Sequence, residues 1–166
     1  KSLSEVPIIV RNERVKMMVK YAMMIALTCA CTMLINIPVP GANGYFNLGD
    51  TMVFIAAILL GKKGGFIGGG IGSALADILL GYTIWAPFTF VIKGVEGYLA
   101  GYLLERTFGQ KHPFLALMPS AVWMVAGYYV VKIFLYGWGP ALLEVPLCTV
   151  QSVVGASVAL AFAKAL

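Results

Sequence analysis

The chain has 166 residues, 60% of them hydrophobic and 11% charged, with a formal net charge of +5 at pH 7. Soluble domains carry about one quarter charged residues, so this composition excludes a soluble globular protein and indicates one all-α integral membrane domain over residues 1–166. A basic excess in a membrane protein reflects the loops on its cytoplasmic side, and we therefore expect a lipid bilayer and no nucleic acid as partners.

Six transmembrane helices are predicted from apolar runs that Gly and Pro residues separate. The predicted ranges are 15–35, 50–60, 66–80, 85–104, 114–136 and 141–166. The second helix is short, and the sequence Gly61-Lys62-Lys63-Gly64-Gly65 separates it from the third. Residues 1–14 form a cytoplasmic N-terminal segment, and the turn-rich residues 36–49 form an external loop that can act as a lid.

Basic residues indicate how these helices are oriented in the membrane. Most of the twelve lie in the N-terminal region, the second and fourth loops or the C-terminus, namely Lys1, Arg11, Arg14, Lys16, Lys20, Lys62, Lys63, Arg106, Lys111 and Lys164. The loops over residues 36–49, 81–84 and 137–140 contain no Lys or Arg. By the positive-inside rule, both termini are cytoplasmic and these three loops are external.

The remaining basic residues, Lys93 and Lys132, fall within predicted membrane spans. Lys93 lies three residues before Glu96, so the two side chains can form an ion pair on one helix. Ionisable groups inside a membrane face the interior of the bundle and are candidate functional residues. We expect Lys93 and Glu96 at the floor of an external pocket, either as a structural pair or in direct contact with a ligand.

Other polar residues lie toward the external ends of the predicted helices. Asp50 and Asp77 belong to the second and third helices, and for Asp77 a structural role at a helix end is favoured. Glu144 opens the sixth helix, and Gln151 lies two turns further on the same face. For Lys132, Glu144 and Gln151, contact with a ligand and structural pairing are both open.

Aromatic residues accompany these polar groups. Tyr128, Lys132 and Tyr136 repeat every four residues, so one helix face carries an amine between two phenols. Aromatic rings with a few fixed polar groups are typical of a pocket for a small heteroaromatic ligand. Trp85 is expected near the mouth of this pocket, with an interfacial membrane anchor as its alternative role.

The sequence offers no catalytic, metal or nucleotide site. Cys29, Cys31 and Cys148 lie in apolar runs and indicate small buried side chains, and the lone His112 falls in a predicted cytoplasmic loop. The Gly-rich residues 64–72 lack the spacing and the terminal Lys-Ser/Thr of a phosphate-binding loop. We therefore expect no metal and no cofactor in this chain, and any use of ATP must occur in another subunit.

The first predicted helix carries a stripe of small residues. Ala22, Ala26 and Ala30 are spaced by four and therefore share one helix face. Such a stripe allows another helix to approach closely. That helix can belong to this chain or to a partner, and the spacing leaves both possibilities open.

Several motifs of the chain occur together in one known family. They are Asn47-Leu-Gly-Asp50, Gly68-Gly-Gly-Ile-Gly-Ser-Ala-Leu-Ala-Asp77, Trp85-Ala-Pro-Phe, Lys93-Gly-Val-Glu96-Gly97 and the alanine stripe. Over residues 16–105 the chain resembles the substrate-binding S components of energy-coupling factor (ECF) transporters, the vitamin uptake systems of prokaryotes. The resemblance implies a non-enzymatic, multi-pass subunit of the plasma membrane that captures a vitamin from outside.

The resemblance also implies a pocket bordered by the fourth to sixth helices, with residues 36–49 as its lid. Taken with the polar residues above, it predicts that the substrate contacts Asn47, Asp50, Trp85, Lys93, Glu96, Tyr128, Lys132, Glu144 and Gln151. The implied partners are a transmembrane coupling subunit (EcfT-type) and two ATPase subunits (EcfA-type), which use ATP and magnesium. In this family the coupling subunit contacts the alanine stripe, here Ala22, Ala26 and Ala30.

The resemblance is to the hydroxymethylpyrimidine-type or pyridoxine-type branch, whose ligands are small aromatic rings with hydroxymethyl groups. Riboflavin, pantothenate and thiamine are alternative substrates. An ion-coupled secondary transporter, with Glu96 or Asp77 as a relay, is an alternative of another class. Such transporters often contain two matching halves, and this sequence shows no internal repeat.

Overall fold

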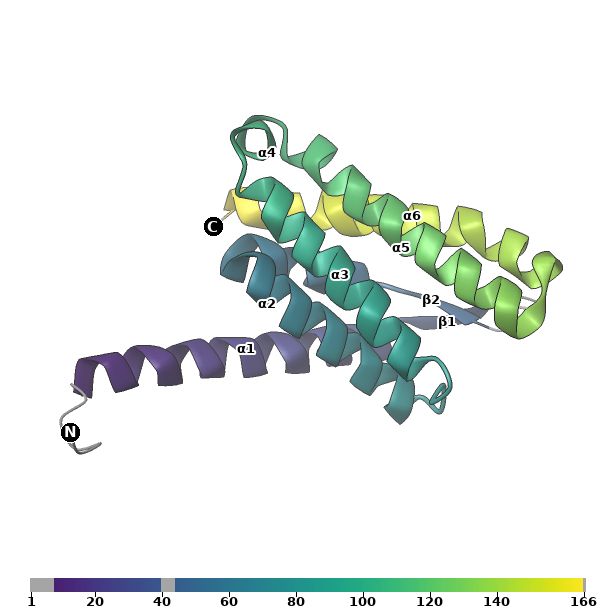
Figure 1. The fold of residues 1–166 in the computed structure, drawn as a ribbon, viewed down its shortest axis with the longest axis horizontal. Coiled ribbons are helices and arrows are strands. Elements are labelled where there is room, and N and C mark those ends of the chain that lie inside the picture. The colour runs from purple at the N-terminus through teal and green to yellow at the C-terminus, as the bar shows by residue number, and fades with distance from the viewer. Residues whose placement is uncertain (1–7, 40–43, 166) are drawn as a thin grey trace.

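The computed structural model of the protein describes residues 8–39 and 44–165. Its elements are α1 (Ile8–Leu34), β1 (Asn36–Val39), β2 (Gly44–Asn47), α2 (Gly49–Leu79), α3 (Ala86–Leu104), α4 (Thr107–Lys111), α5 (Pro113–Tyr136) and α6 (Trp138–Ala165). Figure 1 shows the long helices in one elongated bundle, with the β1–β2 hairpin toward one end and α4 at the other. Within the described ranges, four helices are long and apolar enough to cross a membrane, over Asn12–Leu34, Gly49–Leu79, Pro113–Tyr136 and Trp138–Ala165. The predicted all-α membrane fold is confirmed.

The helix α2 consists of two legs that meet at Gly61. This residue has φ 67° and ψ −168°, which is not helical, and positive φ is a conformation that glycine adopts without steric cost. Across the turn, Gly68 lies against Ala56 and Gly69 lies against Val53, so the two legs pack side by side. The predicted break between the second and third helices therefore exists, although the non-helical backbone is confined to one residue. With its legs counted separately, α2 supplies two of the six predicted helices.

The first leg of α2 forms the centre of the bundle. This leg, residues 49–60, is too short at about 1.5 Å per residue to cross the hydrocarbon core of a membrane. Its residues Val53, Phe54 and Ala56 are all 0% exposed. Gly49 and Asp50, at the start of this leg, are also buried. A carboxylate at the start of this leg therefore has to find its partners inside the protein.

Glycines allow the second leg of α2 to lie directly on α3. A Cβ atom added at Gly65 or Gly97 would overlap the backbone of the other glycine, and a Cβ at Gly70 would lie 2.9 Å from the carbonyl oxygen of Phe90. Backbones approach this closely only where both helices carry small residues. The Gly-rich stretch thus serves packing between helices.

Residues 36–49 were predicted to form a loop, and this prediction is incomplete. Two short strands pair in an antiparallel register, with Asn36 opposite Asn47 and Ile37 opposite Phe46. Pairing satisfies the backbone donors and acceptors of a segment that leaves the helical bundle. The strands were missed because each spans four residues, too few for a periodic pattern. Residues 40–43 lie outside the described part of the chain.

Several helix ends also differ from the prediction. α1 begins at Ile8, within the segment assigned to a cytoplasmic lead-in, and α6 begins at Trp138 rather than at residue 141. The predicted loop 137–140 is reduced to Gly137, whose φ of 85° makes the turn. The short helix α4 was not predicted. The helices α3 and α5 start and end within about a residue of their predicted limits.

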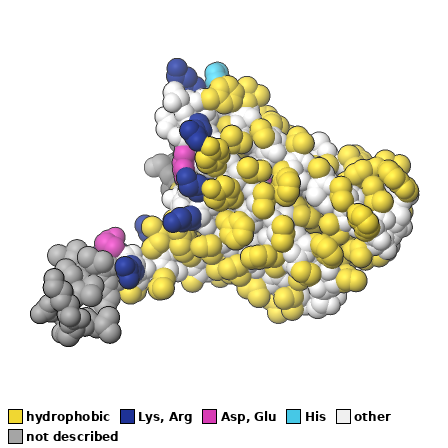
Figure 2. All heavy atoms as spheres, viewed as in Figure 1, with side chains coloured by type: hydrophobic (Ala, Val, Ile, Leu, Met, Phe, Trp, Pro, Cys, Tyr) yellow, Lys and Arg dark blue, Asp and Glu magenta, His cyan; other side chains and the backbone are white. Residues whose placement is uncertain are grey.

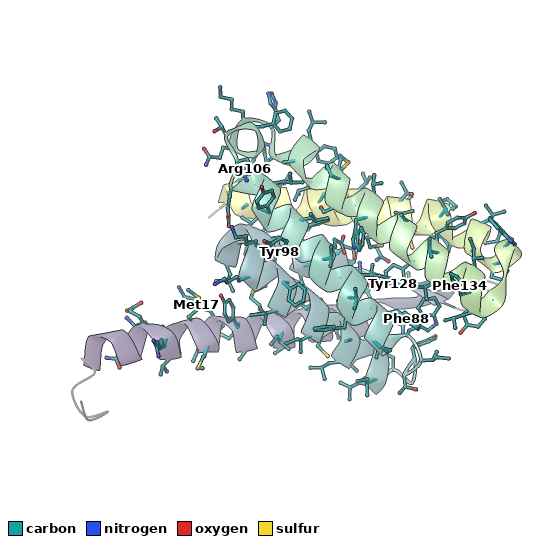
Figure 3. All side chains as sticks on the ribbon, viewed as in Figure 1. Met17, Phe88, Tyr98, Arg106, Tyr128 and Phe134 are labelled. Carbon is teal, nitrogen blue, oxygen red and sulfur yellow. The ribbon has the colours of Figure 1, made fainter. Side chains whose placement is uncertain are left out.

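Apart from the buried Lys93 and Lys132, the described basic residues lie on one side of the molecule (Figure 2). Figure 2 shows Lys and Arg side chains along one edge of the bundle and on the extended N-terminal part of α1, whereas the rest of this face is largely hydrophobic. In Figure 3, Arg106 and Tyr98 lie toward the same end, and Phe88 and Phe134 lie toward the opposite one. This distribution agrees with the predicted topology, in which the basic end is cytoplasmic.

The helix α1 packs on α2 through one face only. Its buried residues Met24 and Thr28 are 6% and 0% exposed. Ala22 and Ala26 each precede one of them by two residues, which places them on the opposite side of the helix. Together with Ala30 they are exposed. The alanine stripe therefore does not pack against the described part of this chain.

Candidate functional site

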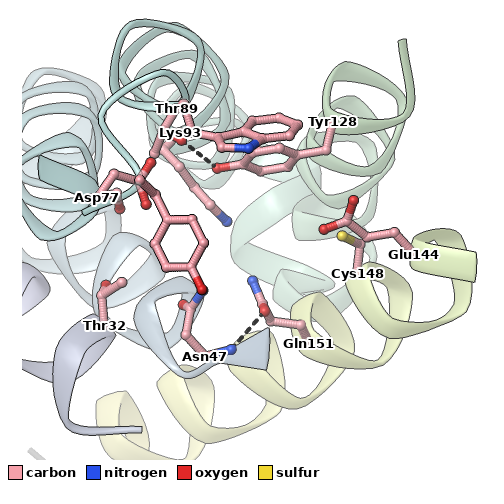
Figure 4. A pocket seen from close by; sticks show the side chains of 12 residues that line it. Thr32, Asn47, Asp77, Thr89, Lys93, Tyr128, Glu144, Cys148 and Gln151 are labelled. Atoms are coloured by element: carbon pink, nitrogen blue, oxygen red, sulfur yellow. Dashed lines mark hydrogen bonds between the residues drawn. The ribbon is translucent and has the colours of Figure 1, made fainter. Parts of the chain in front are cut away.

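A polar cavity lies in the half of the bundle that carries the hairpin. It is bounded by α1, β2, α2, the turn before α3, α3, α5 and α6, and its lining residues are Thr32, Asn47, Ser73, Asp77, Tyr82, Trp85, Thr89, Lys93, Tyr128, Glu144, Cys148 and Gln151 (Figure 4). The volume of the cavity is about 50 Å³. The cavity is therefore narrow.

The predicted substrate contacts divide into two groups. Those that line the cavity are Asn47, Trp85, Lys93, Tyr128, Glu144 and Gln151. Asp50, Glu96 and Lys132 do not line it and are each 0% exposed. These three residues lie behind the cavity wall and bond to residues that form it. Asp77, for which a structural role was favoured, is one of the lining residues.

Lys93 is the centre of a buried charge cluster. Its Nζ donates to Glu96 Oε2 at 3.1 Å and also pairs with Asp50. The predicted contact between Lys93 and Glu96 is thus confirmed. The contact with Asp50 was not predicted, because Asp50 lies 43 residues earlier in the chain and only the packing of α2 on α3 brings the two together.

Asp50 has further partners on α6. Its Oδ1 accepts from Gln151 Nε2 at 3.0 Å, and its Oδ2 accepts from the hydroxyl of Ser152 at 3.0 Å. Three helical segments therefore meet at one carboxylate. Because buried charges require both a counter-ion and hydrogen bonds, this arrangement fixes the direction of the Lys93 amine at the cavity wall.

Aromatic rings form another wall of the cavity. Trp85 is 6% exposed, and its ring centroid lies 6.0 Å from those of both Tyr128 and Tyr136. The Lys132 amine lies 5.4 Å from the Trp85 ring centroid and pairs with Glu144. Since the indole is enclosed by these side chains, Trp85 is not an interfacial membrane anchor.

Tyr128 and Thr89 connect the aromatic wall to the charge cluster. The Tyr128 hydroxyl donates to Thr89 Oγ1 at 3.2 Å, and the Lys93 amine lies 5.7 Å from the Tyr128 ring centroid. Figure 4 shows Thr89, Lys93 and Tyr128 together on one side of the cavity, across from Asn47 and Gln151. Polar and aromatic groups thus surround the same narrow space.

The end of the hairpin closes part of this space. The backbone N–H of Asn47 donates to Gln151 Oε1 at 3.0 Å, which ties β2 to α6. The side-chain oxygen of Asn47 accepts from the Gly49 N–H at 2.7 Å. A Cβ at Gly49 would collide with that oxygen and with Thr32, so glycine is required there. The predicted lid segment is in contact with the cavity at Asn47.

Sequence reasoning missed five lining residues, Thr32, Ser73, Tyr82, Thr89 and Cys148. Three of them carried a signal: Ser73 lies four residues before Asp77, Thr89 lies four residues before Lys93, and Cys148 lies four residues after Glu144. Residues four apart share a helix face, so these side chains could have been placed beside the charged groups. The other two depend on contacts between distant segments.

The electrostatic balance of the site is acidic. Among the described residues, two ammonium groups and four carboxyl groups line the cavity or bond to residues that do, namely Lys93, Lys132, Asp50, Asp77, Glu96 and Glu144. An anionic ligand would meet more carboxyl groups than ammonium groups, whereas a neutral or cationic ring would not be repelled by the carboxyl groups. In the described ranges no three His, Cys, Asp or Glu side chains gather as a metal site.

Comparison with known proteins gives three matches. The family of ECF-type riboflavin transporter S components matches residues 12–166. A protein of Pyrococcus woesei described as "uncharacterized protein in gap 3′region" is 44% identical over 124 residues, which cover 75% of this chain and 83% of that protein. The thiamine precursor transporter HmpT of Lactococcus lactis subsp. cremoris is 32% identical over 145 residues, which cover 87% of this chain and 83% of HmpT.

Proposed function

Because the chain belongs to the family of ECF-type riboflavin transporter S components, we propose that its polar cavity binds a single-ring vitamin or vitamin precursor, hydroxymethylpyrimidine or pyridoxine. Membership makes the chain a vitamin-uptake S component of the membrane. The choice of a single-ring substrate rests on the cavity, which combines narrow space, aromatic walls and hydrogen-bonding groups.

The size of the cavity supports a small ligand. Its volume of about 50 Å³ is well below the usual range for ligand pockets, about 300–1,000 Å³. A single ring with hydroxymethyl groups fits a narrow space beside Trp85 and Tyr128. Riboflavin, with fused rings and a ribityl chain, is the second candidate, which the name of the matching family favours.

The charges of the cavity support a neutral or cationic ligand. Asp77 and Glu144 face the same space as Lys93, and Lys93 is already paired with Asp50 and Glu96. Carboxylates accept hydrogen bonds from amino and hydroxyl groups. Hydroxymethylpyrimidine carries both kinds of group, and pyridoxine carries hydroxyl groups. Pantothenate and phosphate esters are anionic and are disfavoured.

Uptake by this chain is proposed to depend on partner subunits. The exposed alanines at positions 22, 26 and 30 face away from the bundle, and small side chains allow a second membrane helix to approach closely. We assign this face to the transmembrane coupling subunit, with two further subunits hydrolysing ATP. The observation that supports this assignment is that no described segment of the chain covers the stripe.

A binding panel tests the proposed substrate. Purified protein in detergent is heated with hydroxymethylpyrimidine, pyridoxine, thiamine, riboflavin or pantothenate, and the unfolding temperature is recorded. A ligand at one hundred times its Kd stabilises the folded state by about 2.7 kcal/mol. We expect stabilisation by one of the single-ring compounds. Stabilisation by riboflavin alone would contradict the proposal that the cavity binds a single-ring substrate.

Tryptophan fluorescence locates the binding event. Trp85 lines the cavity, whereas the Trp123 N–H donates to the carbonyl of Ile92 and Trp138 is 65% exposed. In a variant that carries Trp123→Phe and Trp138→Phe, the ligand should still change the emission of Trp85. Binding without any change in that emission would place the ligand elsewhere.

Substitution on α1 tests the partner surface. Ala26→Trp should abolish co-purification with a coupling subunit and ATP-driven uptake, while affinity for the ligand stays the same. Leu27→Trp is the matched control, since Leu27 is also exposed, at 44%, but lies about 100° around the helix. Equal effects of the two variants would contradict the assignment.

A further inference from the structure

We infer that Gln151 is a positioning residue that latches the β1–β2 hairpin over the cavity by linking Asn47 to the Asp50–Lys93 pair. The inference concerns how a ligand is retained rather than which ligand binds. The kinetic test of this inference rests on the proposed function, because it requires a bound ligand. A second test requires no ligand and is independent of the proposed function.

The two ends of the Gln151 amide have different partners. Its oxygen accepts from the backbone N–H of Asn47 at 3.0 Å, and its nitrogen donates to Asp50 Oδ1 at 3.0 Å. The same Asp50 oxygen is paired with Lys93. One side chain, 5% exposed, thereby connects the last residue of β2 with the charge cluster of α2 and α3.

Only one orientation of this amide satisfies both partners. A backbone N–H can only donate and an ionised carboxylate can only accept, so the amide oxygen must face Asn47 and the amide nitrogen must face Asp50. Glutamate at this position would keep the first bond but place two carboxylates together. Methionine, of similar length, would keep neither bond.

Contacts that do not involve Gln151 pack α6 on α2. Ser152 donates to the other oxygen of Asp50 at 3.0 Å, and Gly155 lies so close to α2 that an added Cβ would be 2.8 Å from the Cβ of Asp50. We expect these contacts to remain when Gln151 is replaced. The Gln151 oxygen bonds to the hairpin, where β2 contacts both α6 and α1.

The latch lies where it controls release from the cavity. Asn47 and Gln151 both line the cavity, and the bond between them closes the wall at the end of β2. A ligand that leaves past the hairpin requires this bond to open. Loss of the bond should therefore raise the dissociation rate more than it changes the association rate.

The kinetic test uses hydroxymethylpyrimidine, or whichever compound of the binding panel stabilises the protein, in stopped-flow measurements. For Gln151→Met we expect dissociation to be about tenfold faster, which is the effect of about one hydrogen bond, and association to change by less than about threefold. Ser152→Ala is the matched control, because it removes a bond to the same Asp50 without touching the hairpin. A similar increase in dissociation rate in both variants would overturn the inference.

A double variant that exchanges the carboxylate of Asp50 and the amide of Gln151 provides a further kinetic test. Gln151→Glu alone should weaken binding through repulsion between two carboxylates. In the double variant Asp50→Asn with Gln151→Glu, the asparagine amide can donate to the new carboxylate, which also remains near Lys93 as its counter-ion. We expect the double variant to retain ligand longer than Gln151→Glu. The opposite order would overturn the inference.

The second test needs no ligand. A nitroxide at Ile37 on β1, which is 56% exposed, is introduced into a variant whose Cys29, Cys31 and Cys148 are replaced by alanine. Gln151→Met should increase the mobility of this label, and Ser152→Ala should leave it unchanged. An unchanged label in Gln151→Met overturns the latch. A mobile label in a protein whose wild type binds no vitamin would instead contradict the proposed function.

Discussion

Two lysine–carboxylate contacts join α2 to α3, and they lie at opposite ends of this helix pair. At the cavity, Lys93 and Asp50 are 3% and 0% exposed, whereas at the basic end Lys62 and Glu105 are 36% and 47% exposed. In both contacts the partners lie 43 residues apart in the chain. The same chemical pair thus occurs once inside the bundle and once at its surface.

Burial determines how much each ion pair contributes to stability and what role it has. Around Asp50, the partners are Lys93 of α3 and Gln151 and Ser152 of α6, and the carboxylate is 0% exposed, so bulk water cannot replace a lost bond. Around Glu105, the hydrogen bonds come from the Lys62 amine at 3.2 Å and the Lys62 backbone N–H at 3.4 Å. An exposed pair is worth little because water replaces it. The buried pair positions a functional group, and the exposed one caps the turn at Gly61.

The largest effect is expected from removing the buried lysine. Lys93→Met leaves the carboxylates of Asp50 and Glu96 buried without their shared cation, which should cost about 3–5 kcal/mol of folding free energy. Thermal unfolding in detergent measures it. Adding Asp50→Asn and Glu96→Gln should recover much of the loss, because no buried charge then remains. A single variant as stable as the wild type would show that the cluster is not charged or not buried.

The two carboxylates of the cluster, Asp50 and Glu96, should contribute differently to folding stability. Asp50 accepts bonds from Lys93, Gln151 and Ser152, whereas Glu96 accepts from Lys93. We therefore expect Asp50→Asn to destabilise the protein by about 1–3 kcal/mol more than Glu96→Gln. Both variants keep the side-chain volume, so unfolding temperatures compare them directly. A greater loss in Glu96→Gln would contradict the geometry of the cluster.

The close packing of α2 on α3, between the two ion pairs, should stabilise the fold independently of charge. A Cβ at Gly97 would overlap the carbonyl of Gly65, so Gly97→Ala must separate α2 from α3 and should cost about 1–3 kcal/mol. Gly139→Ala is the control, because an added Cβ there meets nothing within 4 Å. Equal unfolding temperatures for the two variants would mean that the helices are not in backbone contact at Gly97.

The smallest effect is expected at the exposed pair, and it should depend on pH. Hydrogen bonds from Lys62 lower the pKa of Glu105 below its usual value of 4.5. A carboxyl group whose pKa is lower in the folded state contributes stability above about pH 4.5, and that contribution is lost as pH falls further. Glu105→Gln should therefore lower the unfolding temperature slightly at pH 7, with no difference from wild type at low pH. A difference that persists at low pH would assign the effect to packing.

Patterns along single helices were the most reliable guides. The positions of α3 and α5, the break at Gly61 and the contact between Lys93 and Glu96 were all predictable, because each depends on residues close in sequence. The strands of the hairpin and the short helix α4 were not, since a few residues carry too little periodicity. The roles of all nine predicted substrate contacts and the partner surface at Ala22, Ala26 and Ala30 remain predictions.

By itself, the sequence determined that this protein is a helical membrane protein of the S component family and that charged side chains lie within it. Apolar length and periodicity fix helices locally, and an intramembrane charge must face inward whatever surrounds it. Only the tertiary structure decided which groups meet. Lys93 pairs with Asp50 as well as Glu96, Gln151 reaches from α6 to the end of β2, and Asp77 faces the cavity. Such contacts join segments far apart in the chain, and their geometry depends on how the helices pack rather than on any local pattern.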